Sequence, residues 1–211
     1  IYGDHGNAPK NCVWLKAIKP QLQWFMCFFR SSGGMIERQF LLSCYVDADT
    51  DVDMILDASP WGIAGILMVD GSPKEYFSDA LSVDDFDIFE HKMGQAEGQQ
   101  VWESLSALVA IRLWKHQWQK HRVKFTVRGD NVAMRTLVVN MRPRSAQLQV
   151  IAQELVMEFC SCSFMPVFAK HIPGVAYKLA DELSRRHHQG AEVLGRSRGD
   201  PPPEARQKVH T

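Results

Sequence analysis

Four acidic residues occupy places in the sequence where a packed core or a solvated surface does not usually need one. In chain order they are Asp57, Glu103, Asp130 and Asp181. If the fold brings them together, their charges repel one another unless a cation neutralises them. Hard carboxylate oxygens suit Mg²⁺ or Mn²⁺, and two such ions about 4 Å apart are a standard arrangement for phosphodiester hydrolysis. The four acids are therefore candidate metal ligands of a nuclease site.

Each acid taken alone also has an ordinary structural explanation. Glu103 can be a favourable acid near a helix start, and Asp181 can be the same in a later helix. Asp130, followed by Asn131, can be part of a helix cap. Asp57 is the hardest to explain in this way, because an acid that closes a buried strand is costly without partners. Spacing alone therefore leaves both a metal site and ordinary structural roles open.

The segments around the acids predict an α/β fold with a mixed sheet. Apolar runs bounded by turn residues predict strands at 53–58, 63–69, 74–77, 123–127 and 163–169. Apolar stripes predict helices at 99–119, at 145–160, with Ser145 as its N-terminal cap, and at 177–186. A further short helix is expected directly after Asp130. Residues 80–98 are expected to form an acidic, loop-like insert, and Asp70-Gly71 predicts a hairpin. Asp57 and Asp130 will meet at one sheet edge if their strands are neighbours.

Along the chain we expect a lead-in at 1–50, the α/β domain at 51–187 and a disordered polar tail at 188–211. In the lead-in, apolar residues at helical spacing between Cys12 and Arg30 predict an amphipathic helix that Pro20 interrupts. Its apolar face has to be buried against the following domain or a neighbour outside this sequence. Because the sequence starts at Ile1 and not at Met, we expect a fragment or a processed piece.

The composition excludes several classes of protein. The 211 residues are 45% hydrophobic and 23% charged, which is typical of a globular chain and not of a disordered or fibrous one. No apolar stretch approaches the roughly 20 residues that span a bilayer, and no signal-peptide pattern opens the sequence. Five cysteines without CxxC spacing disfavour a disulfide framework and a zinc site. We therefore expect an intracellular protein, cytoplasmic or nuclear and not secreted, with no membrane partner.

The net charge of zero hides two opposite blocks. Residues 51–100 hold eleven acids and two bases, whereas residues 101–150 hold nine bases and two acids. Such a chain can hold a divalent metal on one surface and bind a polyanion with another, although two ordinary solvated faces would also explain the charges. The candidate phosphate contacts are Arg112, Lys115, Lys120, Arg122, Lys124, Arg128, Arg135, Arg142 and Arg144.

Five segments between residues 51 and 187 form a recognisable series. They are LDASPWGIAGIL, KEYFSDAL, WESLSALVAIRLW, VRGDNVA and HIPGVAYKLADELSR, of which the last is the most specific. In this order they resemble the ribonuclease H domain of retroelement reverse transcriptases. Two positions depart from the family pattern, since Gly129 replaces the usual Thr or Ser and Tyr177 stands where Asn is common. The resemblance implies a ribonuclease H-like α/β fold with a mixed five-stranded sheet flanked by helices.

The resemblance also implies a metal-dependent endoribonuclease that cleaves the RNA strand of RNA–DNA hybrids with two Mg²⁺ ions, or with Mn²⁺. The metal ligands it implies are Asp57, Glu103, Asp130 and Asp181. His171 would assist leaving-group protonation or product release from a mobile loop. Residues 1–50 would be the tail of a tether, or connection, that joins this domain to a reverse transcriptase polymerase domain on its N-terminal side. The alternative is a catalytically inactive relic or a structural, nucleic-acid-binding domain of the same fold, while an integrase or Holliday-junction resolvase would lack the HIPG segment.

Overall fold

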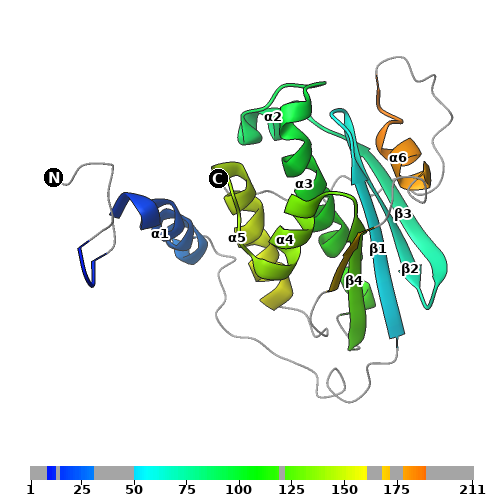
Figure 1. Ribbon diagram of the computed structural model, residues 1–211, viewed down its shortest axis with the longest axis horizontal. Coiled ribbons are helices and arrows are strands. Elements are labelled where there is room, and N and C mark those ends of the chain that lie inside the picture. Colours follow the sequence, from blue (N-terminus) through cyan, green and yellow to red (C-terminus); the bar gives the residue numbers. More distant parts are fainter. Residues whose placement is uncertain are drawn as a thin grey trace. The chain divides into compact units, whose positions relative to one another are not determined.

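The computed structural model describes residues 9–12, 15–30, 50–118, 122–160, 168–171 and 178–188. Five strands form one sheet: β1 (Thr50–Ala58), β2 (Gly62–Val69), β3 (Ser72–Ala80), β4 (Val123–Gly129) and β5 (Phe168–His171). Their order is β3-β2-β1-β4-β5, with β3, β2 and β1 antiparallel and β1, β4 and β5 parallel. The predicted mixed five-stranded sheet flanked by helices is confirmed (Figure 1).

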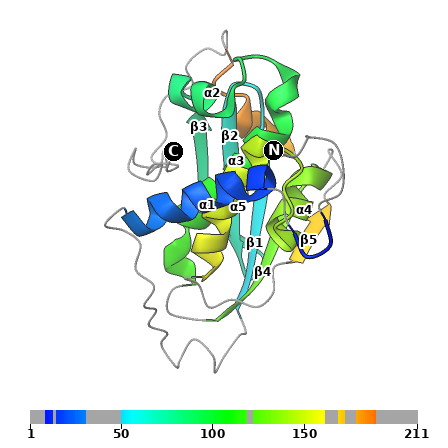
Figure 2. The same cartoon turned by 90° about the vertical axis from the view of Figure 1, so that its left-hand side faces the viewer.

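The last strand continues two residues beyond its predicted end. β5 begins at Phe168 and ends at His171, whereas the apolar pattern predicted a strand at 163–169 with His171 in the following loop. Its partner is β4, with Thr126 opposite Phe168 and Gly129 opposite His171, and Figure 2 shows the two strands side by side. Residues 163–167 of the predicted strand lie outside the described residues.

The hairpin between β2 and β3 turns at Asp70 and Gly71, as the sequence predicted. Both residues have positive φ, 49° and 75°, which is the backbone geometry of a tight hairpin that matches the twist of its strands. The Asp70 carboxylate accepts a hydrogen bond from the Asp51 backbone N–H at 2.9 Å. This bond ties the turn to the start of β1, the strand that carries Asp57.

Side chains alternate between the two faces of β1, and each face has its own hydrophobic cluster. Met54 and Leu56 belong to the main core, whereas Ile55 packs in a smaller cluster with Leu183 of helix α6 (Lys178–Ser184). Figure 1 shows α3, α4 and α5 on one side of the sheet and α6 on the other. Since helices cover both faces, the end of β1 is held in a fixed position.

The main core lies under α3 (Gln99–Leu113), α4 (Val132–Asn140) and α5 (Ala146–Cys160). α3 is buried from Val101 to Ile111 without interruption, because it packs against the sheet as well as against α4 and α5. The helices after β4 begin where the sequence predicted. Asn131 caps α4 by accepting hydrogen bonds from the next turn, and the Ser145 hydroxyl accepts one from the Leu148 N–H at the start of α5.

Helix α3 ends at Leu113, before the predicted end at residue 119. The backbone of Trp114 leaves the helical conformation, and a short 3₁₀ turn, η3 (Lys115–Gln117), follows. After this turn the fully buried Trp118 ring lies 5.0 Å from the ring of Phe125 on β4. The packing of large aromatic rings, which local spacing does not reveal, therefore accompanies the end of the helix.

The sequence predicted a loop for the acidic segment after β3, but this segment contains helix α2 (Val83–Phe89). Ser82 and Asp85 form a reciprocal capping box at its start, and this signal outweighs the acidic composition. A short 3₁₀ turn, η2 (Ala96–Gly98), then leads into α3. The rings of Phe86 and Phe89 meet Trp102 of α3 edge to face at 5.3 and 5.8 Å, so the segment packs against the domain as expected.

Helix α1 (Leu15–Arg30) lies in a compact unit of its own. It continues through Pro20, where the sequence predicted an interruption. Its apolar side chains are exposed: Leu15, Ile18, Leu22, Phe25, Met26 and Phe29. That they are buried against the following domain or a neighbour outside this sequence stays a prediction. No helix in the described ranges is long and apolar enough to cross a membrane. The polar tail from residue 189 onward lies outside the described residues.

Candidate metal centre

Asp57 and Asp130 meet at one end of the sheet because their strands are parallel neighbours. Ile55 of β1 is in register with Arg128 of β4, so Asp57 and Asp130, each two residues further on, lie at the same level. Asp57 is the penultimate residue of β1, and Asp130 directly follows β4. The sequence predicted this meeting of two strand ends, and the sheet order confirms it.

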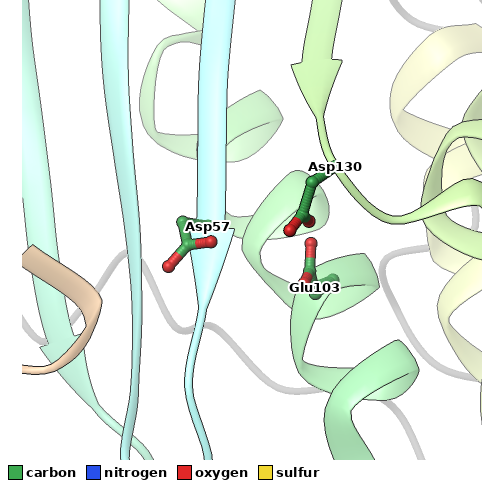
Figure 3. A group of neighbouring side chains, drawn as sticks. All are labelled: Asp57, Glu103 and Asp130. Carbon is green, nitrogen blue, oxygen red and sulfur yellow. The ribbon is translucent and has the colours of Figure 1, made fainter. Parts of the chain in front are cut away.

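Glu103 completes a group of three carboxylates. It is the fifth residue of α3, and Gln99, the first residue of this helix, donates a hydrogen bond to the Ala58 carbonyl at the end of β1. One carboxylate oxygen from each of Asp57, Glu103 and Asp130 lies within 4.8 Å of the other two. Figure 3 shows Glu103 and Asp130 pointing toward each other, with one oxygen of Asp57 directed toward both. Asp57 and Glu103 are buried, and Asp130 is exposed, so the group opens to solvent on one side.

Burial makes the charged form of Asp57 costly. It raises the pKa of this carboxyl from 3.8 to about 6, although the hydrogen bond from Ser184 opposes the rise. The negative charges of Asp181 and Asp130 raise it further, and Arg185 lowers it. A divalent cation at this position would therefore offset the cost of the negative charge on Asp57 at neutral pH.

Glu103 is perturbed more strongly. Burial raises its pKa to about 8, and a hydrogen bond from Gln99 opposes this rise. The charges of Asp130 and Asp57 add to the rise, as does the hydrogen bond that protonated Glu103 can form with Asp130. Gln99 Nε2 donates to Glu103 Oε1 at 3.0 Å and to the Ala58 carbonyl at 2.6 Å. Glu103 Oε2 is buried without a hydrogen-bond partner among the described residues. An unsatisfied buried oxygen in a group of three carboxylates fits a hard divalent cation, for which Asp57, Glu103 and Asp130 can supply oxygens.

Asp181 lies beside this group, outside the set whose oxygens are within 4.8 Å of one another. It is in the first turn of α6, half-exposed, and its Oδ1 accepts a hydrogen bond from Arg185 Nε at 2.6 Å. Its charge is near enough to raise the pKa of Asp57. Of the four predicted ligands, the structure thus gathers three and places the fourth next to them, in an ion pair.

His171 is the last residue of β5 and is in register with Gly129, the residue before Asp130. The backbone of the predicted proton-transfer residue therefore lies on the strand next to β4, at the end of the sheet where Asp130 stands. The resemblance placed His171 in a loop, whereas the structure places it within the sheet ladder.

Of the nine predicted phosphate contacts, four form ion pairs within the domain: Arg112, Lys115, Lys124 and Arg128. Arg135 donates to the Asn131 carbonyl at 3.4 Å, and Arg122 is half-buried. Arg112 pairs with Glu154 and Glu158 of α5, Lys115 pairs with Glu158, and Arg128 pairs with Asp53 at 2.8 Å. These cations join elements of the domain to one another through ion pairs. The distribution of charge along the sequence did not predict these pairs. Arg142 and Arg144, between α4 and α5, are exposed and form no ion pair within the described residues. Lys120 lies outside the described residues.

Two residues that contact the buried carboxylates were missed by the sequence reasoning. Gln99 precedes Glu103 by four residues, a spacing that places the two side chains on one helix face and that could have identified it. Ser184 donates to Asp57 from 127 residues further along the chain, and no local signal reveals that contact.

Comparison with known proteins gives matches only among solved structures. No protein-family model matches the sequence. No curated protein matches it either. Ribonuclease H1 from the halophilic archaeon Halobacterium salinarum is similar at 13% identity and a TM-score of 0.48, covering 65% of this chain and 96% of the archaeal one.

Two further solved structures show similar proteins. LC11-ribonuclease H1, crystallised in complex with an RNA/DNA hybrid, matches at 14% identity and a TM-score of 0.49 over 63% of this chain and 93% of its own. A foamy viral protease-reverse transcriptase in complex with double-stranded DNA matches at 14% identity and a TM-score of 0.35 over 80% of this chain and 31% of its own. Identities and scores of this size do not identify an activity.

Proposed function

We propose that this chain is a metal-dependent endoribonuclease that cleaves the RNA strand of RNA–DNA hybrids. The observation that carries the proposal is the group formed by Asp57, Glu103 and Asp130, with oxygens within 4.8 Å of one another at the ends of β1 and β4. Two of these acids are buried and have raised pKa values, about 6 and about 8, which is unusual for residues with only a structural role. The five sequence segments that resemble ribonuclease H domains supply the reaction class.

In this proposal the three gathered carboxylates hold the divalent cation, and Asp181 is a fourth ligand beside them. Bound Mg²⁺ would supply a hydroxide nucleophile at neutral pH and stabilise charge on the leaving 3′ oxygen. Asp130, the exposed member, faces the side from which a phosphodiester can approach. His171 would give a proton to the leaving group or assist product release. The expected products are a 5′-phosphate and a 3′-hydroxyl.

We further propose that the domain belongs to a retroelement reverse transcriptase, with a polymerase domain on the N-terminal side. The support is the segment HIPGVAYKLADELSR, which contains His171, Asp181 and Ser184 in the spacing of the retrotransposon signature. The hybrid would be recognised by its shape and by 2′-hydroxyl contacts, with little sequence preference. Exposed Arg142 and Arg144 are the proposed phosphate contacts.

The test is cleavage of an end-labelled RNA–DNA hybrid in Mg²⁺, with RNA–RNA and DNA–DNA duplexes of the same sequence as controls. We expect cuts in the RNA strand of the hybrid alone, products with 3′-hydroxyl ends, and complete loss of cleavage in EDTA. Salt-dependent binding of the hybrid by folded protein, without cleavage in Mg²⁺ or Mn²⁺, would instead identify a non-catalytic binding domain.

A further inference from the structure

Ser184 is a fully buried residue that touches a proposed metal ligand. It is the last residue of α6, and its hydroxyl donates a hydrogen bond to Asp57 Oδ2 at 2.6 Å. The same hydroxyl lies 3.1 Å from the Asp181 carbonyl, the ordinary helical acceptor for a serine at this position. A hydroxyl has one proton, and the shorter contact to a carboxylate is the stronger of the two. The serine is thus directed at Asp57.

The position of Ser184 is fixed by a second hydrogen bond. Its carbonyl accepts from the Ser59 hydroxyl at 2.7 Å, and Ser59 follows Asp57 by two residues in the turn after β1. The contacts form a closed ring: Asp57 leads along the chain to Ser59, Ser59 donates to Ser184, and Ser184 donates back to Asp57. Because each member of the ring is buried, the Asp57 carboxylate has little freedom to rotate.

The hydrogen bond occupies one oxygen of Asp57 and leaves the other for a ligand. Oδ2 accepts the hydrogen bond from Ser184 of α6. Figure 3 shows one oxygen of Asp57 turned toward Glu103 and Asp130 and the other turned away from them, toward the side of the sheet on which Figure 1 shows α6. Glu103 is arranged in the same way, since Gln99 occupies its Oε1 and Oε2 has no partner among the described residues. In both buried acids, one oxygen is held by a neutral donor and the other remains for the cation.

We propose that Ser184 is a positioning residue that orients Asp57 for cation binding. The inference rests on the proposed function only in that it requires a divalent cation at the three carboxylates. Residues that orient metal ligands by hydrogen bonds typically contribute about 10- to 100-fold to metal affinity. A bound cation and the serine proton would share the carboxylate without competing, because each takes a different oxygen.

A different explanation is that Ser184 only fastens α6 to the sheet. Ser78 provides the matched control, because it does fasten α6 without touching a carboxylate. Its hydroxyl donates to the Leu183 carbonyl at 2.7 Å, one residue before Ser184, and it is similarly buried. If docking of α6 were all that mattered, Ser78→Ala and Ser184→Ala would have the same effect on the metal site.

The experiment measures Mn²⁺ and Mg²⁺ dissociation constants by titration calorimetry on the full chain, with thermal unfolding in EDTA to verify folding. We expect Ser184→Ala to weaken binding about tenfold or more, Ser78→Ala to change it less than about twofold, and Ser184→Thr, which keeps the hydroxyl, to restore part of the loss. Wild-type affinity in Ser184→Ala would overturn the proposal, as would equal weakening in Ser78→Ala.

The two proposals fail in different ways. Asp57→Asn locates the titrated cation, because binding at the three carboxylates has to weaken when Asp57 loses its charge. Should the wild type bind the cation there and lose affinity in Ser184→Ala, but cleave no hybrid, the role of Ser184 stands and the nuclease function does not. A wild type that binds no divalent cation at these residues overturns the role of Ser184 as well.

Discussion

Gln99 and Glu103 lie one helical turn apart on α3, and the Gln99 amide donates a hydrogen bond to Glu103 Oε1 at 3.0 Å. The other oxygen of this carboxylate, Oε2, is buried without a hydrogen-bond partner among the described residues. The amide also reaches the Ala58 carbonyl, at the end of the strand that carries Asp57. One neutral side chain therefore connects Glu103 to the end of the strand that carries Asp57. The Gln99 amide does not reach Glu103 Oε2, so the free-energy cost of burying this oxygen without a hydrogen bond remains, and a bound cation would remove it.

The stability of the metal-free protein should fall as the pH rises. On folding, the pKa of Asp57 rises from 3.8 to about 6 and that of Glu103 from 4.5 to about 8. At a pH between these values, the folded state therefore binds more protons than the unfolded state. The stabilisation that comes from these extra protons is fully present below about pH 4 and is lost as the pH rises to about pH 8. In EDTA we expect the Tm to decrease between pH 5 and roughly pH 8, and Mg²⁺ to raise the Tm more at the higher pH.

The matched control for this prediction is Glu103→Gln, which cannot lose a proton. This variant should show a flatter dependence of Tm on pH in EDTA and a smaller increase with Mg²⁺. A wild-type Tm that stays constant or rises between pH 5 and roughly pH 8 in EDTA would contradict the raised pKa values.

Replacement of Gln99 by Leu should destabilise the protein, because Glu103 Oε1 and the Ala58 carbonyl both lose their donor. Unsatisfied buried acceptors cost about 1–3 kcal/mol each, so we expect the free energy of unfolding in urea to fall by about that amount or more. Gln100→Leu, at the exposed neighbouring position, is the control and should change stability by less than about 0.5 kcal/mol. Equal effects of the two substitutions would show that the amide contacts do not matter.

Arg112 and Arg144 should affect different properties, although both belong to the basic part of the sequence. Arg112 joins α3 to Glu154 and Glu158 of α5. Arg112→Gln should lower the free energy of unfolding by about 3 kcal/mol, since the buried Glu154 carboxylate loses its arginine, while Glu158 keeps its ion pair with Lys115. Arg144→Gln should leave stability unchanged, weaken hybrid binding and reduce the salt dependence of binding by about one unit of slope. If the salt dependence of hybrid binding is unchanged in Arg144→Gln, Arg144 does not contact a phosphate.

Much of the architecture could be predicted because its signals are local. Asp70-Gly71 identifies the hairpin, Asn131 and Ser145 identify two helix starts, and apolar runs bounded by turn residues identify the strands. The approach of Asp57 to Asp130 required only one further assumption, that β1 and β4 are parallel neighbours. Helix α2 also has a local signal, its capping box at Ser82, but the acidic composition of the segment concealed it.

The remaining features depend on contacts between distant parts of the chain. The end of α3 coincides with the packing of Trp118 on Phe125, and the pairing of Arg112 depends on where α5 lies. Asp181 can face either the other acids or Arg185, four residues away, and spacing does not distinguish these two arrangements. The contact between Ser184 and Asp57 depends on the docking of α6, which no short segment specifies.

The measurement that tests the central claim most directly compares wild-type protein with Asp57→Asn in the cleavage of a labelled RNA–DNA hybrid, with hybrid binding measured in parallel. If the three carboxylates hold the catalytic cation, Asp57→Asn should lower the cleavage rate by about 100-fold or more and leave the affinity for the hybrid within about threefold. Asp57→Asn protein that folds and cleaves the hybrid at the wild-type rate would contradict the account.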